Sequence, residues 1–140
     1  AEKEGLRTLT FLGDLFPDPF QGFMASDKKI AEWPGDVKRW LRAMMRALMF
    51  IRERPEEAAD IALKKIPMGS PSRPIVIEGI RRFVRALPDG IPGVPSAQGL
   101  KNVIEFDVKA PLKIKEDVAP EKFLALKLAA EVKEELERKR

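Results

Sequence analysis

The sequence contains no cysteine, no histidine and no tyrosine. The missing cysteines exclude disulfides, thiolate nucleophiles and thiolate metal sites, and the missing histidines exclude a Ser–His–Asp triad. A site made of carboxylates remains open, but Asp60, Asp107 and Asp117 are isolated in the sequence and lack the spacing of metal ligands. We therefore expect no enzymatic activity, no metal ion and no cofactor.

Long apolar runs are also missing. No run approaches the roughly 20 residues that a membrane span needs. The first residues, Ala1-Glu2-Lys3-Glu4, have no apolar segment of the signal-peptide kind, so we expect no signal peptide in this chain. The formal net charge of +4 comes from 26 basic and 22 acidic side chains, a mixture that favours no nucleic-acid partner.

What remains is 140 residues, 44% of them hydrophobic, which predicts one domain spanning 1–140 with a sizeable core. Residues 6–12, in which Leu9 and Phe11 alternate with threonines, predict a strand, and residues 21–25 predict a second short one. Two strands do not make an independently stable sheet. These strands must therefore pack on helices, or pair with another segment or another chain.

Five or six helices are expected after the second strand. Serine and aspartate are good N-caps, and proline fits the first turn of a helix because its missing N–H would be unpaired there. Residues 88–95 form an irregular loop by their proline and glycine content. The helices are expected from Ser26 or Asp27 to Trp33, from Pro34 to before Pro55, from Pro55 onward, after Pro74, from Ser96 to Pro111 and from near Pro120.

Several stretches carry a resemblance to a known family. They are Trp33-Pro34-Gly35-Asp36-Val37, Arg54-Pro55-Glu56-Glu57-Ala58-Ala59 and Ser96-Ala97-Gln98-Gly99-Leu100, together with residues 16–22, 25–30, 41–43, 101–104 and 118–123. In this order and spacing the set resembles the C-terminal part of solute-binding proteins of the nitrate/sulfonate/taurine and thiamine-precursor type. Those proteins serve ABC transporters.

The resemblance implies an α/β fold, as part of a two-lobed periplasmic-binding-protein of type II, although the chain itself is helix-dominated. It implies a small-molecule ligand, an ABC permease as partner and a periplasmic or other extracytoplasmic location. Family members are about twice as long as this chain. The chain then corresponds to the hinge strand and the C-terminal helical part, and a partner N-terminal half or a second copy is expected to complete it.

The resemblance also places one loop near the ligand cleft. Its candidate ligand-binding residues are Asp14, Leu15, Phe16, Phe20 and Gln21. The aromatic rings would stack on a ligand, and the carboxylate would bind a cationic group. The alternative is a turn in which the aspartate caps the backbone locally and both rings enter the core.

Two further sets of residues allow a functional and a structural interpretation. Met44, Met45 and Met49 form either an adaptable binding face or ordinary core, and core is the commoner case. The basic side chains of the long helix suit an acidic partner or, more commonly, a solvated face; they are Lys38, Arg39, Arg42 and Arg46.

The sequence thus predicts a solute-binding module that captures its ligand non-covalently. The alternative is a protein-interaction or homodimerisation domain derived from the same family. In that case, the strand at 6–12 or the apolar helix faces would pair with another copy, because unpaired strand edges and large apolar patches favour association.

Overall fold

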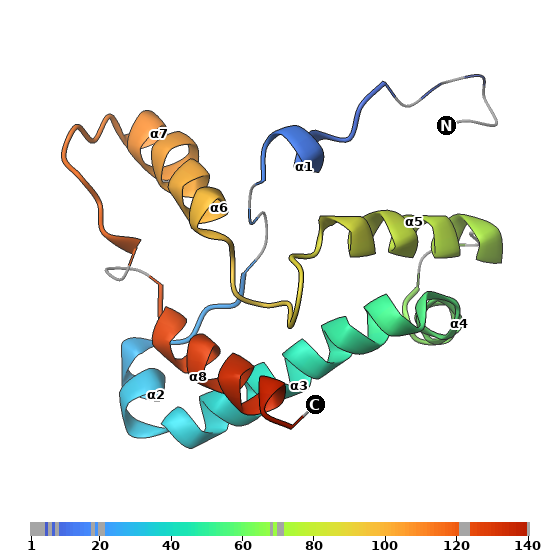
Figure 1. Cartoon of the computed structure of the whole chain (residues 1–140), viewed down its shortest axis with the longest axis horizontal. Helices are drawn as coiled ribbons and strands as arrows, with labels where there is room; N and C mark the ends of the chain where they lie inside the picture. The colour runs from blue at the N-terminus through green and yellow to red at the C-terminus, as the bar shows by residue number, and fades with distance from the viewer. Residues whose placement is uncertain are drawn as a thin grey trace. The chain divides into compact units, whose positions relative to one another are not determined.

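The computed structural model describes residues 5, 7, 9–17, 19, 22–67, 69, 72–120 and 124–139, and only the backbone of Asp14. Figure 1 shows the chain and its helices. The chain divides into two compact units. Unit 1 comprises Ala1–Gly22 and Pro95–Phe123, and unit 2 comprises Phe23–Val94 and Leu124–Arg140. The single domain expected for residues 1–140 stays a prediction.

The predicted α/β class, with its two strands, is wrong: the described residues contain helices and no strand. Residues 9–11 have no regular structure, and Leu12–Leu15 form the short helix α1 instead. Residues 22–25, the described part of the second predicted strand, are irregular, while residues 6, 8 and 21 lie outside the described residues. A strand needs a neighbour to pair with, and alternation at Leu9 and Phe11 supplies none.

Unit 2 contains five helices among its described residues. They are α2 (Asp27–Glu32), α3 (Pro34–Glu53), α4 (Pro55–Lys65), α5 (Arg73–Ala86) and α8 (Leu126–Glu137). The predicted start signals of α2, α3 and α4 are confirmed. The Ser26 hydroxyl accepts the Lys29 N–H at 3.2 Å, and Pro34 and Pro55 open the two helices that follow. The last helix begins at Leu126 rather than near Pro120.

The core of unit 2 lies where α8 and the 88–95 loop pack on α3. Met45, Ile91 and Val132 are at most 1% exposed, and Ala129 and Leu136 join them. Lys38 pairs with Glu131, and Arg42 pairs with Glu135 one turn further along both helices. The two helices therefore run in the same direction, as Figure 1 shows.

This core bears on the methionine-rich helix. Of its three methionines, Met45 is buried in the core and Met49 packs against it, while Met44 is not part of this cluster. Trp40 lies outside this core and is 41% exposed. The buried face of α3 therefore runs through Leu41, Met45 and Met49, because α8 packs against that side.

Unit 1 is built around one continuous helical stretch. It consists of α6 (Ala97–Asn102), the π-helix η2 (Val103–Lys109) and α7 (Ala110–Leu112). The predicted cap is confirmed, because the Ser96 hydroxyl accepts the Gly99 N–H at 3.0 Å. The stretch continues past Pro111, within α7, and ends at Lys113, whose φ of 54° is left-handed.

Candidate binding site

A hollowed surface lies in unit 2, where α4 and α5 pack against each other beside the end of α3. It is an apolar groove of about 470 Å³. All of its lining residues are apolar: Ile51, Ala58, Ala62, Ile75, Val76, Gly79, Ile80 and Phe83. We call this surface the α4–α5 groove. Its volume lies within the roughly 300–1,000 Å³ of small-ligand pockets.

The sequence of α4 explains why there is a hollow. Ala58 and Ala62 stand four residues apart, so they share one face of the helix. Each presents a single methyl group, which leaves space above the larger side chains of α5. On α5, Ile77 is buried, while Ile75 is 55% and Phe83 46% exposed. The groove is therefore open to water along its α5 side.

Two ion pairs join α4 to α5. The Arg73 guanidinium donates two hydrogen bonds to Asp60, at 2.6 and 3.1 Å. Arg81 donates to Glu56 at 2.6 Å. These hydrogen bonds hold the pKa of the Asp60 and Glu56 carboxyls below their ordinary values. Glu56 and Asp60 lie away from the alanine face of α4, so the groove itself is lined by apolar residues alone, which suits non-covalent binding of an apolar partner.

The predicted ligand loop lies in unit 1. Asp14 and Leu15 belong to α1, and Phe16 follows that helix, its N–H donating to the Leu12 carbonyl at 2.8 Å. Phe20 and Gln21 lie outside the described residues. The structure therefore describes three of the five candidate residues, which are consecutive in the sequence. The binding role of all five stays a prediction.

The loop is fastened by residues that sequence reasoning missed. The Asn102 amide is buried, donates to the Pro17 carbonyl at 2.7 Å and accepts from Gln98 at 2.8 Å. Gly99 lies close to the loop, because a Cβ added there would lie 3.2 Å from the Pro19 ring, a tight contact. The sequence carries no local signal for these contacts, because Asn102 lies on the opposite side of the helix from the apolar Leu100 and Ile104.

An aromatic pair lies beside this polar anchor. The rings of Phe16 and Phe106 meet edge to face, with their centroids 5.1 Å apart. Phe106 belongs to η2, and π-helical turns often occur at functional sites. The loop and the helix 97–112 thus form one packed surface in unit 1.

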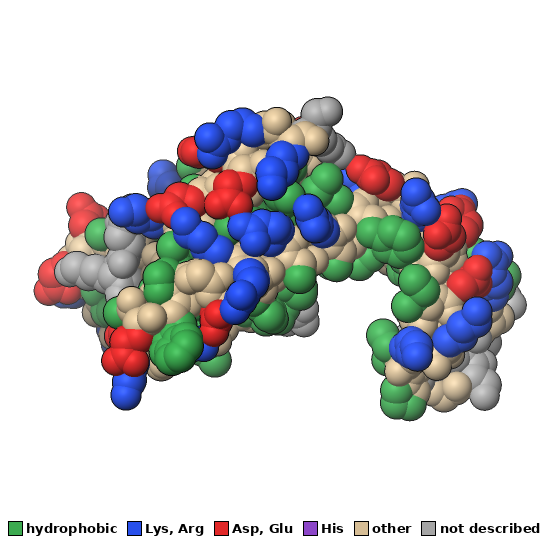
Figure 2. Space-filling model, turned by 90° about the horizontal axis from the view of Figure 1, so that it is seen from below, with side chains coloured by type: hydrophobic (Ala, Val, Ile, Leu, Met, Phe, Trp, Pro, Cys, Tyr) green, Lys and Arg blue, Asp and Glu red, His purple; other side chains and the backbone are tan. Residues whose placement is uncertain are grey.

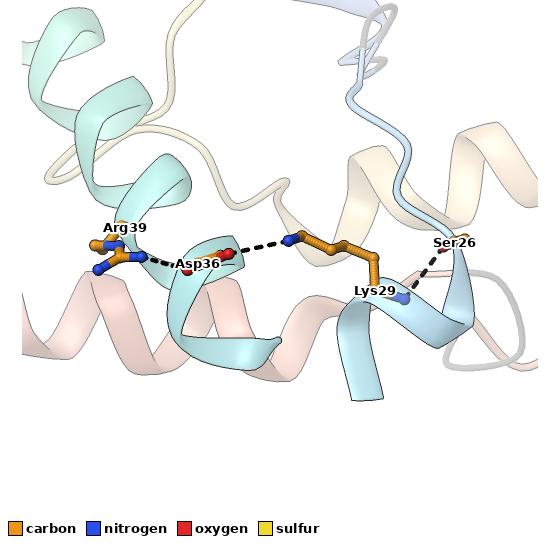
Figure 3. A network of polar contacts seen from close by, with 4 residues as sticks. All are labelled: Ser26, Lys29, Asp36 and Arg39. Carbon is orange, nitrogen blue, oxygen red and sulfur yellow. Dashed lines mark hydrogen bonds and ion pairs between the residues drawn. The ribbon is translucent and has the colours of Figure 1, made fainter. Parts of the chain in front are cut away.

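A second polar network lies at the junction of α2 and α3. Lys29 donates to Asp36 at 3.0 Å, Arg39 also pairs with Asp36, and Ser26 caps α2 (Figure 3). The Lys29 ammonium also lies over the Trp33 ring, 4.8 Å from its centroid. Hydrogen bonding by Lys29 lowers the pKa of Asp36. These contacts fix the corner between two helices and leave the carboxylate ionised, which gives it a structural role.

Within the described residues, no three acidic side chains gather closely enough to hold a metal ion. No helix in the described part of the chain combines the length and apolarity that crossing a membrane demands.

Comparison with known proteins adds no relative. No protein-family model, no curated protein and no solved structure matches the chain.

Proposed function

We propose that the protein is a non-catalytic binding module, and that its class is the solute-binding component of an ABC transporter. The observation that carries binding is a pair of exposed apolar side chains, Leu15 (71% exposed) and Phe16 (39% exposed), on the loop of unit 1 that Asn102 fastens. Such a surface gains free energy by leaving water, at about 25 cal/mol per Å² of apolar area buried.

The class rests on the resemblance given by the sequence. Three of its stretches coincide with helix starts: Pro34 begins α3, Pro55 begins α4 and Ser96 caps α6. An ABC permease as partner and an extracytoplasmic location belong to the same proposal. The solute would meet Asp14, Leu15 and Phe16, on the loop that Asn102 fastens.

Calorimetric titration with nitrate, taurine and a thiamine-precursor pyrimidine tests solute capture. We expect heat of binding from at least one of these compounds at millimolar concentration, and its loss in Phe16→Ala. Phe83→Ala, which shortens an aromatic side chain in the α4–α5 groove, is the matched control and should keep the heat. Solute capture is refuted if none of the compounds gives heat, or if the two variants lose it equally.

The second candidate function is homodimerisation through the helices. The partly exposed Ile75 and Phe83 of the α4–α5 groove favour it, because large apolar side chains that face water in one cluster mark interaction surfaces. Figure 2 shows hydrophobic side chains exposed between charges of both signs on the face that it presents. Sedimentation across a range of dilutions tests this candidate, which predicts a species that dissociates to about 16 kDa (15.8 kDa by sequence) on dilution.

A further inference from the structure

We propose that a second copy of this chain covers the α4–α5 groove, with α5 packed antiparallel on α5 of the other copy about a two-fold axis at Gly79. The inference rests on the homodimerisation candidate and deepens it. It names the surface, the register and the pairs of side chains that meet.

The exposed stripe of α5 carries the first part of the argument. Ile75, Gly79 and Phe83 follow each other at four-residue steps, so they share one face of the helix. Ile77, on another side, is buried. At a rise of about 1.5 Å per residue, the two large side chains stand about 6 Å before and after the glycine.

This stripe is complementary to itself. A two-fold axis through Gly79 sets the two glycines against each other and lays Ile75 of each copy opposite Phe83 of the other. The small residue in the centre lets the two backbones approach, and the large residues at both ends fill the space beside the crossing. Two-fold pairing is also the commonest closed assembly of soluble proteins.

Gly79 provides an independent observation. A Cβ added at this position would meet nothing within 4 Å, so the fold of the single chain has no steric need for glycine. Glycine inside a helix costs about 1 kcal/mol relative to alanine. A close approach by another backbone explains a glycine at a helical position with open space.

The charges favour a second copy over a charged partner. Arg82 donates to Glu78 at 2.9 Å, and Arg81 is held by Glu56. Glu78 precedes Gly79 by one residue and Arg82 follows it by three, so both lie on the same flank of the stripe. Antiparallel pairing preserves that flank and places each Glu78 between Arg82 and Glu78 of the other copy, with the two arginines at the ends of the row. The face is thus neutral in sum.

Sedimentation equilibrium of the full chain and its variants tests the arrangement. Gly79→Gln puts a side chain at the crossing and should raise the dimer Kd at least about tenfold, without loss of helix by circular dichroism. Gly35→Gln is the matched control, because Gly35 also has open space around it but lies in the first turn of α3, outside the stripe of α5. This control should leave Kd unchanged.

A charge exchange tests the register. Glu78→Arg and Arg82→Glu should each weaken the dimer, because like charges then meet across the axis. The double exchange restores opposite charges and should return Kd to within about threefold of the parent value. If the dimer withstands Gly79→Gln and the charge reversals, the α5 arrangement is overturned while homodimerisation stands. A monomer at every concentration overturns both.

Discussion

Each of the two units is stabilised internally by a different kind of contact. Unit 2 buries Met45, Ile91 and Val132 almost completely, in a core drawn from two helices and a loop. In the described part of unit 1 the buried side chains are few, and one of them is the polar Asn102. Unit 1 is fastened by hydrogen bonds from that amide and by the contact between Phe16 and Phe106.

This difference predicts that the free energy of opening is larger in unit 2 than in unit 1. Burying a large apolar side chain contributes about 1.5–3 kcal/mol, whereas an ordinary hydrogen bond contributes a net 0.5–1.5 kcal/mol, roughly. Parts of a protein with few buried apolar contacts open at lower free energy than the core. We therefore expect unit 1 to open before unit 2. Both tryptophans, Trp33 and Trp40, lie in unit 2, so tryptophan fluorescence reports on unit 2.

The largest effect is expected from the core of unit 2. Met45→Ala removes a side chain that is 1% exposed and should lower the free energy of unfolding by about 2–5 kcal/mol. Met24→Ala is the matched control, because Met24 is fully exposed, and its effect should stay within about 0.5 kcal/mol. Denaturant unfolding followed by tryptophan fluorescence measures both. Equal effects of the two changes would contradict a core centred on Met45.

A smaller and local effect is expected in unit 1. Asn102→Ala leaves the Pro17 carbonyl and the Gln98 amide without their partner and should cost about 1–3 kcal/mol. Hydrogen exchange should rise in peptides from 95–120, while the fluorescence midpoint of unit 2 stays unchanged. Gln98→Ala keeps the bond to Pro17 and should cost less. A fluorescence midpoint that moves with Asn102→Ala would show that the units do not open separately.

Local signals predicted most helix starts. Ser26, Pro34, Pro55 and Ser96 act on the backbone within one turn, so their effect can be deduced from neighbouring residues. The strands failed for the opposite reason. Alternation at Leu9 and Phe11 describes one half of a pair, and a ladder also requires the other half.

Core positions depended on contacts that are distant in sequence. Ile91 was assigned to an irregular loop, which is correct for its backbone, but its side chain enters the core beside Met45. Arg52 fastens that loop by donating to the Pro88 carbonyl at 2.6 Å. Nothing near Ile91 in the sequence reveals this burial, because its partners come from α3 and α8.

The candidate sites show the same limit. The α4–α5 groove depends on Ala58 and Ala62 lying beside Ile80, a pairing that two separate helical stripes do not disclose. Asn102 could be placed on a helix from the sequence, but its partner Pro17 lies 85 residues away. Side chains were predictable as members of a helix face, and their partners were not.

The smallest effect concerns the pH dependence of stability, which has opposite signs in the two units. In unit 2 the hydrogen bond from Arg42 holds the pKa of the Glu135 carboxyl below its ordinary value. The unfolded chain then binds this proton more readily than the folded chain. The stabilisation is therefore complete above the ordinary pKa, near 4.3, and is lost as the pH falls through the lower folded value.

In unit 1 the hydrogen bond to Glu105 raises the pKa of Lys109. This stabilisation is complete below the ordinary lysine pKa, near 10.4, and is lost as the pH rises through the folded value.

Denaturant midpoints of unit 2, followed by tryptophan fluorescence, should fall between about pH 5 and pH 3, less steeply in Glu135→Gln than in the neighbouring control Glu134→Gln. Hydrogen exchange of 95–120, corrected for intrinsic rates, should instead accelerate above about pH 10, and Lys109→Met should abolish that rise. If the denaturant midpoint falls equally steeply with pH in the two glutamate variants, the Arg42–Glu135 pair does not stabilise unit 2. If hydrogen exchange still accelerates at alkaline pH in Lys109→Met, Lys109 does not stabilise unit 1.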